Sequence, residues 1–256
     1  MKRTTIKFIA VCAATMLTVS SFAQKFQFGI RYIPTLTSLI NKDDKDAGPE
    51  LDKKSTRSLI TAGFAFDYAF NKNNGLEVDI LYSRQGQEYT GVNMQSGSTT
   101  AYNRVVAEQA ILNGAPTVGS YQAKAELNSI KIPILLKLST ATKKNMFYTL
   151  SVGPQINYLS DAVYELNGND VDLTGTGLKP IDTYKKVTID GVLGFGLGYN
   201  ASKHFVLSLG ARFDYGFEDV EKKNVTYSTS IPYYPAGRGS THNATAGLVF
   251  GVSYKL

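Results

Sequence analysis

The sequence predicts an all-β protein, an eight-stranded antiparallel up-and-down transmembrane β-barrel. Three observations support this prediction. Large apolar residues alternate with small or polar ones, with a period of two, in eight separate segments. The connections between these segments alternate strictly between long and short. The first residues have the pattern of a secretory signal peptide.

The alternation is clearest at the C-terminus, where the large apolar residues share one face of the strand and the residues between them are small or polar. These apolar residues are Leu248, Phe250, Val252, Tyr254 and Leu256. The other segments repeat the pattern, and a strand of about 9–11 residues crosses a membrane at a tilt. The predicted strands are residues 25–33, 58–70, 76–89, 126–138, 146–159, 187–200, 204–217 and about 243–256.

The connections fall into two classes of length, long and short, that alternate along the chain. The strands of a soluble sandwich also alternate apolar and polar residues, but nothing in that fold requires its connections to alternate in length. In a barrel with both chain ends in the periplasm, every short turn falls on the periplasmic side and every long loop outside. Tyrosines near strand ends suit a membrane interface, although tyrosine also favours strands in general. The short connections are residues 71–75, 139–145 and 201–203; the long ones are residues 34–57, 90–125, 160–186 and 218–242.

The chain divides into a cleaved signal peptide, residues 1–23, and one outer-membrane β-barrel domain, residues 24–256. Basic residues open the signal, an apolar run too short to span a bilayer follows at residues 8–19, and Ser21-Phe22-Ala23 fits a cleavage site. We therefore expect export through this signal to the outer membrane of a Gram-negative cell envelope, with both mature termini in the periplasm.

Composition excludes several classes of function. The chain has 27 Lys+Arg and 21 Asp+Glu; three basic residues leave with the signal, so 24 remain against 21, a net charge of +3. This charge is too small to indicate a nucleic-acid partner. Cys12, the only cysteine, also leaves, so no disulfide or thiolate metal site can form. No run of 18 apolar residues exists, which excludes helical membrane spans.

The fourth predicted strand carries a recognisable motif, Asn128-Ser-Ile-Lys-Ile-Pro-Ile-Leu-Leu-Lys137, centred on Ile132 and Pro133. It resembles the L-x-I-P-(L/I)-L-L-K segment of the PorT-like outer-membrane β-barrel proteins. Residues 29–32, 75–83 and 194–199 also resemble strands of that family. The chain departs from the family at Lys131, where an acidic residue is frequent, and at Leu256, where an aromatic residue is frequent. The resemblance implies a small porin-like barrel of the cell envelope, and the name-giving member assists protein secretion.

Pro133 lacks an N–H and cannot donate to a strand ladder. We therefore expect a bulge or local bend there, with the ring facing inward. A hinge that opens the wall is the alternative.

The lumen of an eight-stranded barrel is only wide enough for side chains to fill it. Strand parity places five acids and five bases inside, and we expect them to pair as a structural plug, with Glu77 or Asp79 reaching Lys137. A narrow polar channel is the alternative. The ten predicted interior charges are Arg31, Asp67, Glu77, Asp79, Lys131, Lys137, Asp190, Arg212, Asp214 and Lys255.

The sequence does not predict an enzyme, and no catalytic, cofactor-binding or metal-ligating residue is assigned. Lipid-modifying chemistry usually needs a base beside a nucleophile. His204 and His242 are expected at opposite ends of the barrel, and only His242 has hydroxyl neighbours, Ser240 and Thr241. Asp219 could approach it from a long loop. No phosphate-binding or metal-ligand motif is present.

We therefore expect a structural or interaction barrel with long surface loops and a filled polar interior. The alternatives are an accessory component of a secretion or envelope-assembly machine, a narrow channel and a lipid-modifying enzyme. Its expected partners are outer-membrane lipid, the barrel-assembly machinery and an envelope or secretion protein. No cofactor and no nucleic acid is expected.

Overall fold

The computed structural model describes residues 26–41, 52–58, 61–93, 120–141, 145–166, 168–170, 179–222, 225–226, 232–233 and 240–256. The predicted signal peptide and residues 42–51 lie outside this part of the chain. Within it, no helix is long and apolar enough to cross a membrane.

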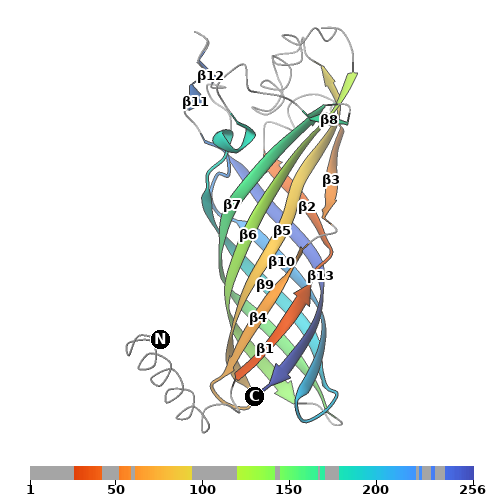
Figure 1. The fold of residues 1–256 in the computed structure, drawn as a ribbon, viewed down its shortest axis with the longest axis vertical. Coiled ribbons are helices and arrows are strands. Elements are labelled where there is room, and N and C mark those ends of the chain that lie inside the picture. The colour runs from red at the N-terminus through yellow and green to blue at the C-terminus, as the bar shows by residue number, and fades with distance from the viewer. Residues whose placement is uncertain are drawn as a thin grey trace, which may run out of the picture.

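Strands account for almost all of the described chain (Figure 1). The strands are β1 (Phe26–Tyr32), β2 (Thr35–Asn41), β3 (Asp52–Ser58), β4 (Thr61–Ala69), β5 (Asn74–Asn93), β6 (Ser120–Ala141), β7 (Met146–Leu166), β8 (Asn169–Asp170), β9 (Val187–Asn200), β10 (Phe205–Gly216), β11 (Val225–Thr226), β12 (Pro232–Tyr233) and β13 (Thr241–Lys255). One short 3₁₀ helix, η4 (Pro180–Thr183), precedes β9.

The wall is a closed antiparallel barrel of eight strands. β1 and β2 pair with β13 in one register, with Tyr32 opposite Phe250 and Thr35 opposite Gly247, so they form one wall strand. β3 and β4 likewise both pair with β5. The order around the wall is β1/β2, β3/β4, β5, β6, β7, β9, β10 and β13, which returns to β1. The predicted fold is confirmed, and the first and last wall strands pair with each other to close the barrel.

Several wall strands are longer than predicted. The expected loop at residues 34–57 contains β2 and β3, and β5, β6 and β7 are 20, 22 and 21 residues long. Apolar alternation ends where the strands leave the apolar band. The ladder continues because each backbone N–H and C=O still has a neighbouring strand to pair with.

The prediction of a bulge at Pro133 is wrong. The ladder between β6 and β7 keeps its register from Ser129 to Ala141, with Pro133 opposite Gln155, and the ring is buried in the interior as expected. The irregularity lies higher, where Asn128 pairs with Asp161 and Ser129 with Leu159, so Ser160 is the extra residue. A bulge there reverses the faces of the upper part of β7.

The short turns are built by asparagine and serine side chains. Asn71 Oδ1 accepts hydrogen bonds from the backbone N–H groups of Asn73 and Asn74, both at 2.9 Å. Asn145 has φ of 61°, in the left-handed region that asparagine tolerates. Ser202 Oγ accepts from the N–H of Phe205 at 3.0 Å. Such side chain to backbone bonds favour turns over continued strand.

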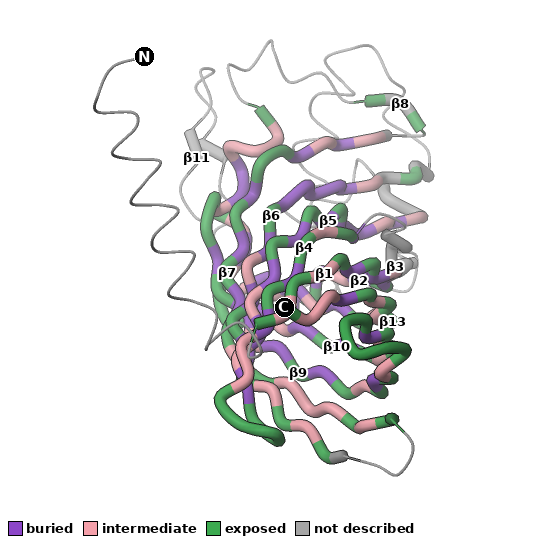
Figure 2. Tube along the Cα trace, turned by 60° about the horizontal axis from the view of Figure 1, so that its bottom comes forward, coloured by how far each residue is buried: buried purple, intermediate pink, exposed green. Residues whose placement is uncertain are grey.

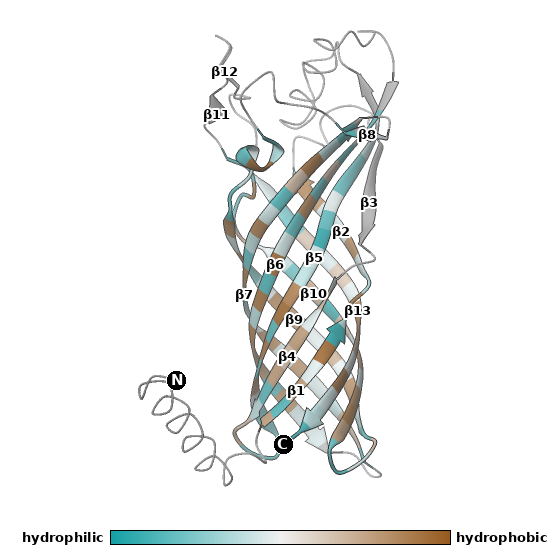
Figure 3. Cartoon of the chain, in the orientation of Figure 1, coloured by the Kyte–Doolittle hydropathy of each residue, from teal (hydrophilic) through white to brown (hydrophobic). Residues whose placement is uncertain are grey.

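The two faces of the wall are inverted relative to a soluble protein. Outward Phe64 and Ile30 are 62% and 59% exposed, whereas inward Gln155 and Asp190 are fully buried. Figure 2 shows this alternation along the strands, and Figure 3 shows apolar residues concentrated on the lower barrel. Monomeric soluble proteins rarely expose a continuous apolar surface of this extent, whereas a transmembrane barrel presents it to lipid.

The two ends of the barrel differ. The turns β4–β5, β6–β7 and β9–β10 lie at one end, together with the start of β1 and the C-terminus (Figure 1). We call this the short-turn end. The opposite, long-loop end carries the extended tips of β5, β6 and β7 and the helix η4.

Candidate functional site

The interior of the barrel is the candidate site, because eight of the ten predicted interior charges form ion pairs inside it. They belong to two groups at different heights. The Arg31 cluster contains Arg31, Asp67, Glu77 and Lys137; the Arg212 cluster contains Asp79, Lys131, Arg212 and Asp214.

The Arg31 cluster joins four adjacent wall strands, β1, β4, β5 and β6. Lys137 Nζ lies 2.6 Å from Asp67 Oδ1 and 2.9 Å from Glu77 Oε2. Arg31 Nη2 lies 3.3 Å from the same Glu77 oxygen, and its Nη1 donates to Ser253 Oγ at 3.3 Å. The cluster has two positive and two negative groups, so its charges balance.

The Arg212 cluster crosses the whole lumen. Arg212 lies on β10, which faces β5 across the barrel in the strand order, and its Nη1 reaches Asp79 Oδ2 of β5 at 3.3 Å. Its Nε lies 2.9 Å from Asp214 Oδ1, and Lys131 Nζ of β6 lies 2.9 Å from Asp214 Oδ2. The guanidinium also donates to Gln155 Oε1 of β7 at 2.6 Å. Arginine suits this role because its planar fork donates in several directions at once.

The remaining two predicted interior charges are not in ion pairs in the described structure. Asp190 is fully buried and accepts a hydrogen bond from Gln155 Nε2 at 3.2 Å. Lys255 lies at the short-turn end, where its Nζ donates to Asn200 Oδ1 at 2.5 Å. The contact expected between Lys137 and an acid of β5 is made by Glu77, whereas Asp79 meets Arg212 instead.

An uncharged layer lies above the Arg212 cluster, toward the long-loop end. Gln85 of β5 accepts from Asn243 Nδ2 at 2.8 Å and donates to Thr245 Oγ1 at 3.2 Å, both on β13. Thr37 Oγ1 donates to Gly86 O at 2.9 Å, and Gln87 Oε1 accepts from Ser38 Oγ at 3.0 Å. This layer was not predicted, because it contains no charged residue, although Gln85 shares the inward parity of Glu77 and Asp79.

A second cluster that the sequence did not predict, which we call the cap, lies at the long-loop end and joins β7 to η4. The bulge at Ser160 turns Tyr164 inward, where it hydrogen-bonds Thr183 of η4, and Thr183 Oγ1 donates to Pro180 O at 2.7 Å. Tyr184 packs edge-on against Tyr164 with ring centroids 6.1 Å apart. Strand parity read without the bulge places Tyr164 on the outer face.

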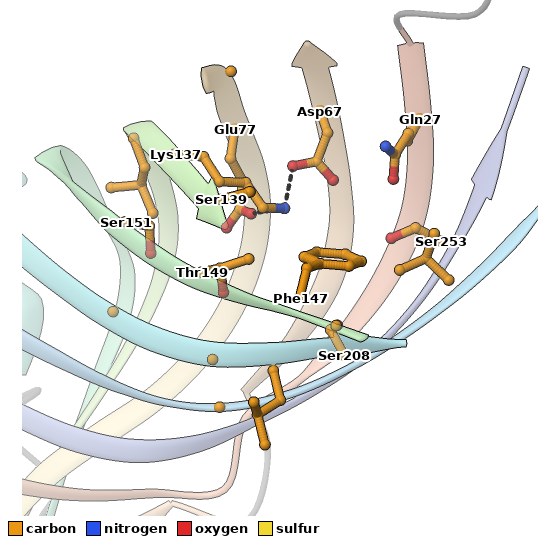
Figure 4. Close-up of a pocket in the computed structure, with 18 of the residues that line it drawn as sticks. Gln27, Asp67, Glu77, Lys137, Ser139, Phe147, Thr149, Ser151, Ser208 and Ser253 are labelled. Atoms are coloured by element: carbon orange, nitrogen blue, oxygen red, sulfur yellow. Dashed lines mark hydrogen bonds and ion pairs between the residues drawn. The ribbon is translucent and has the colours of Figure 1, made fainter. Parts of the chain in front are cut away.

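At the short-turn end, the lumen widens into a cavity of about 450 Å³. Figure 4 shows Ser139, Thr149, Ser151 and Phe147 arranged around it together with the Lys137 ion pairs. The cavity exists because the inward residues of β9 here are glycines: Gly194, Gly196 and Gly198. An added Cβ at Gly198 would lie 2.1 Å from the Phe147 ring, so this glycine makes room for the aromatic side chain.

The histidines lie at opposite ends of the barrel, as expected. His204 stacks on Tyr254 at 5.4 Å, and His242 stacks on Tyr215 at 5.9 Å. His242 Nδ1 hydrogen-bonds Gly216 O at 3.0 Å. Asp219 Oδ1 accepts from the backbone N–H of Thr241 at 3.0 Å. The described residues also contain no group of three His, Cys, Asp or Glu placed to hold a metal ion.

Comparison with solved structures returns small outer-membrane barrels. Neisserial surface protein A is 14% identical, with 90% of this chain and 97% of that chain covered and a TM-score of 0.46. OprG of Pseudomonas aeruginosa is 11% identical, with 91% and 97% covered and a TM-score of 0.45. The outer membrane protease OmpT of Escherichia coli is 9% identical, with 91% and 97% covered and a TM-score of 0.41.

No curated protein matches the chain. Residues 20–222 match a protein family described as outer membrane protein beta-barrel domain. This match covers more than half of the sequence and agrees with the closed barrel, its lipid-facing apolar surface and its polar lumen. The chain therefore belongs to the outer-membrane β-barrel domain family.

Proposed function

We propose that the protein is a non-conducting outer-membrane barrel with a structural or interaction role, in which the long-loop end meets partners outside the cell. The observation that carries this proposal is the ion pair from Arg212 to Asp79, which crosses the lumen between opposite walls. The Arg31 cluster and the uncharged layer add further barriers along the same path. Ions would have to pass paired charges and buried hydrogen bonds at each level.

We infer an orientation with the short-turn end in the periplasm. Short turns face the periplasm in bacterial outer-membrane barrels, and the start of β1 and the C-terminus share that end. The signal at residues 1–23 would deliver the chain there for insertion by the barrel-assembly machinery. Lipid would then contact the outward apolar residues, and an envelope protein would be the remaining partner.

The PorT-like resemblance supports a second candidate, an accessory role in a secretion or envelope-assembly machine. The Ile-Pro motif lies in the middle of β6, with Pro133 facing the interior and opposite Gln155. A deletion strain would test this role. Loss of secreted proteins, with outer-membrane permeability unchanged, is its expected result, and normal secretion would reject it.

We propose that the protein is not an enzyme. A lipid-modifying site would need His242 beside an orienting acid, whereas Asp219 binds the backbone of Thr241 and His242 Nδ1 meets Gly216 O. The other histidine lies at the far end of the barrel.

Single-channel recording in planar bilayers tests the non-conducting proposal. The folded protein, verified by its shifted band on unheated gels, should give no discrete conductance steps. The triple variant Arg31→Ser, Lys131→Ser and Arg212→Ser lacks three long side chains in the lumen and should conduct ions. Arg84→Ser alters the outer face and should not. Regular conductance steps from the unaltered barrel would overturn the proposal.

A further inference from the structure

The cavity at the short-turn end is too large to be a packing defect. Its volume of about 450 Å³ falls within the 300–1,000 Å³ of typical small-molecule sites. The upper lumen is filled by glutamine, asparagine and charged side chains, whereas the walls here carry glycine, serine and threonine. The wall hydroxyls belong to Ser139, Thr149, Ser151, Ser208 and Ser253. Hydroxyls both donate and accept hydrogen bonds, so these walls suit a ligand that is itself rich in hydroxyls.

The charges around the cavity favour an anion. Among the described residues that line it, five are basic and three are acidic, a net charge of +2. The three acids, Asp67, Glu77 and Asp79, are all held in ion pairs at the inner end. Two of the five bases, Lys72 and Lys255, lie at the outer end, and Lys255 contacts the uncharged Asn200. An incoming carboxylate would therefore meet positive groups first.

The inner end of the cavity is closed by a buried acid. Asp79 is 1% exposed, and its Oδ1 has no hydrogen-bond partner among the described residues, although the residue lines the cavity. Leaving a buried carboxylate oxygen without a donor costs free energy. That oxygen has almost no accessible surface, so the hydroxyls of the wall, and not Asp79, offer hydrogen bonds to a molecule in the cavity. The Phe147 ring, held over Gly198, adds an apolar face inside the same space.

We propose that this cavity binds a small sugar acid that enters from the short-turn end. Its carboxylate would lie near Lys255, its hydroxyls would exchange hydrogen bonds with the serine and threonine side chains, and its ring would pack against Phe147. This binding role extends the proposed function without depending on it, because a barrel closed to ions can hold a ligand at one end.

Titration calorimetry on the full-length barrel in detergent tests the site. The probes are glucuronate, glucose as the neutral ring, acetate as the charge without a ring, and a glycine tripeptide as a peptide carboxylate. Glucuronate should bind at least about tenfold more tightly than the other three, because only it has both the charge and the hydroxyls.

Matched variants locate the site. Ser139→Leu fills the cavity and should abolish binding, whereas Thr140→Leu makes the same kind of change on the outward face of β6 and should not. Lys255→Gln should weaken glucuronate binding by about fivefold, the scale of one partly exposed charge interaction. Lys203→Gln, on an exposed turn outside the cavity lining, should leave it unchanged. The shifted band on unheated gels shows that each variant is folded.

Three results would overturn the proposal. The first is that glucuronate does not bind at about 10 mM, which is a weak limit on the affinity scale. The second is that the tripeptide binds as tightly as glucuronate or more tightly, and the third is that Ser139→Leu and Thr140→Leu have equal effects on binding. Conductance steps from the unaltered protein would reject the non-conducting role but would not affect this binding test.

Discussion

Replacing Arg212 with methionine should be among the most destabilising single changes in the barrel. The Arg212 side chain is 7% exposed. Its guanidinium contacts Asp79 of β5 at 3.3 Å, Gln155 of β7 at 2.6 Å and Asp214 of its own strand, β10, at 2.9 Å. Removing one partner of a buried ion pair costs about 3–5 kcal/mol, because the other charge is left uncompensated. Asp214 keeps its ion pair with Lys131, whereas Asp79 keeps no ion pair within the described part of the chain.

Arg84→Met is the matched control. Its Nε lies 2.8 Å from Glu126 Oε1, as close as the Arg212 pair, but the Arg84 side chain is 46% exposed on the outer face of β5. Exposed ion pairs contribute at most about 1 kcal/mol. Burial, rather than bond length, therefore predicts the difference between these two arginines.

Urea unfolding of the barrel in lipid vesicles, followed by the gel shift and circular dichroism, gives the free energy of unfolding. Arg212→Met should lose about 3–5 kcal/mol and Arg84→Met at most about 1 kcal/mol. Adding Asp79→Leu to Arg212→Met removes the uncompensated acid and should restore about 1–3 kcal/mol. Equal losses for the two arginines, or a double variant no more stable than Arg212→Met, would refute the reasoning.

Three other predictions test the wall and the cap. Gly198→Ala should destabilise the barrel by about 1–3 kcal/mol, and Phe147→Ala should rescue it, because the added Cβ clashes with the Phe147 ring. Phe147→Ala should not rescue Gly63→Ala, because the Cβ added at Gly63 would lie 1.9 Å from the backbone oxygen of Ile80. Both are measured by urea unfolding. Tyr164→Phe removes the hydrogen bond between Tyr164 and Thr183 in the cap. Hydrogen exchange in residues 179–186 should become faster, while the free energy of unfolding falls by only about 1 kcal/mol. A uniform increase of the exchange rate across the barrel would contradict this. Deleting residues 248–256 should abolish the folded band on gels, because this part of β13 pairs with β1 and β10 and closes the barrel, whereas deleting residues 42–46 should preserve the band.

The period of two in the sequence was sufficient to predict the barrel, its strand number and the direction in which most wall residues point. Asp67 and Arg212 lie on the inner face because side-chain direction in a strand depends only on position. The same rule failed for Tyr164, because one extra residue at Ser160 reverses the faces beyond it. Nothing in the local sequence around Ser160 indicates this bulge.

Strand lengths and interior contacts required the tertiary structure. β5 continues to Asn93 because β3 and β6 offer backbone partners there, not because its own residues alternate. Asp79 meets Arg212 rather than Lys137 because barrel closure brings β10 opposite β5, a relation between residues 133 positions apart.

The sequence by itself determined the class of protein: alternating strands, long and short connections and a balanced set of inward charges. These follow from local geometry, in which each residue's face is decided by its neighbours along the chain. The tertiary structure alone decided which charges pair, that a cap joins β7 to η4 at the long-loop end, and that glycines on β9 leave a cavity at the other end. Those features depend on distances across the lumen, which arise only when the wall closes.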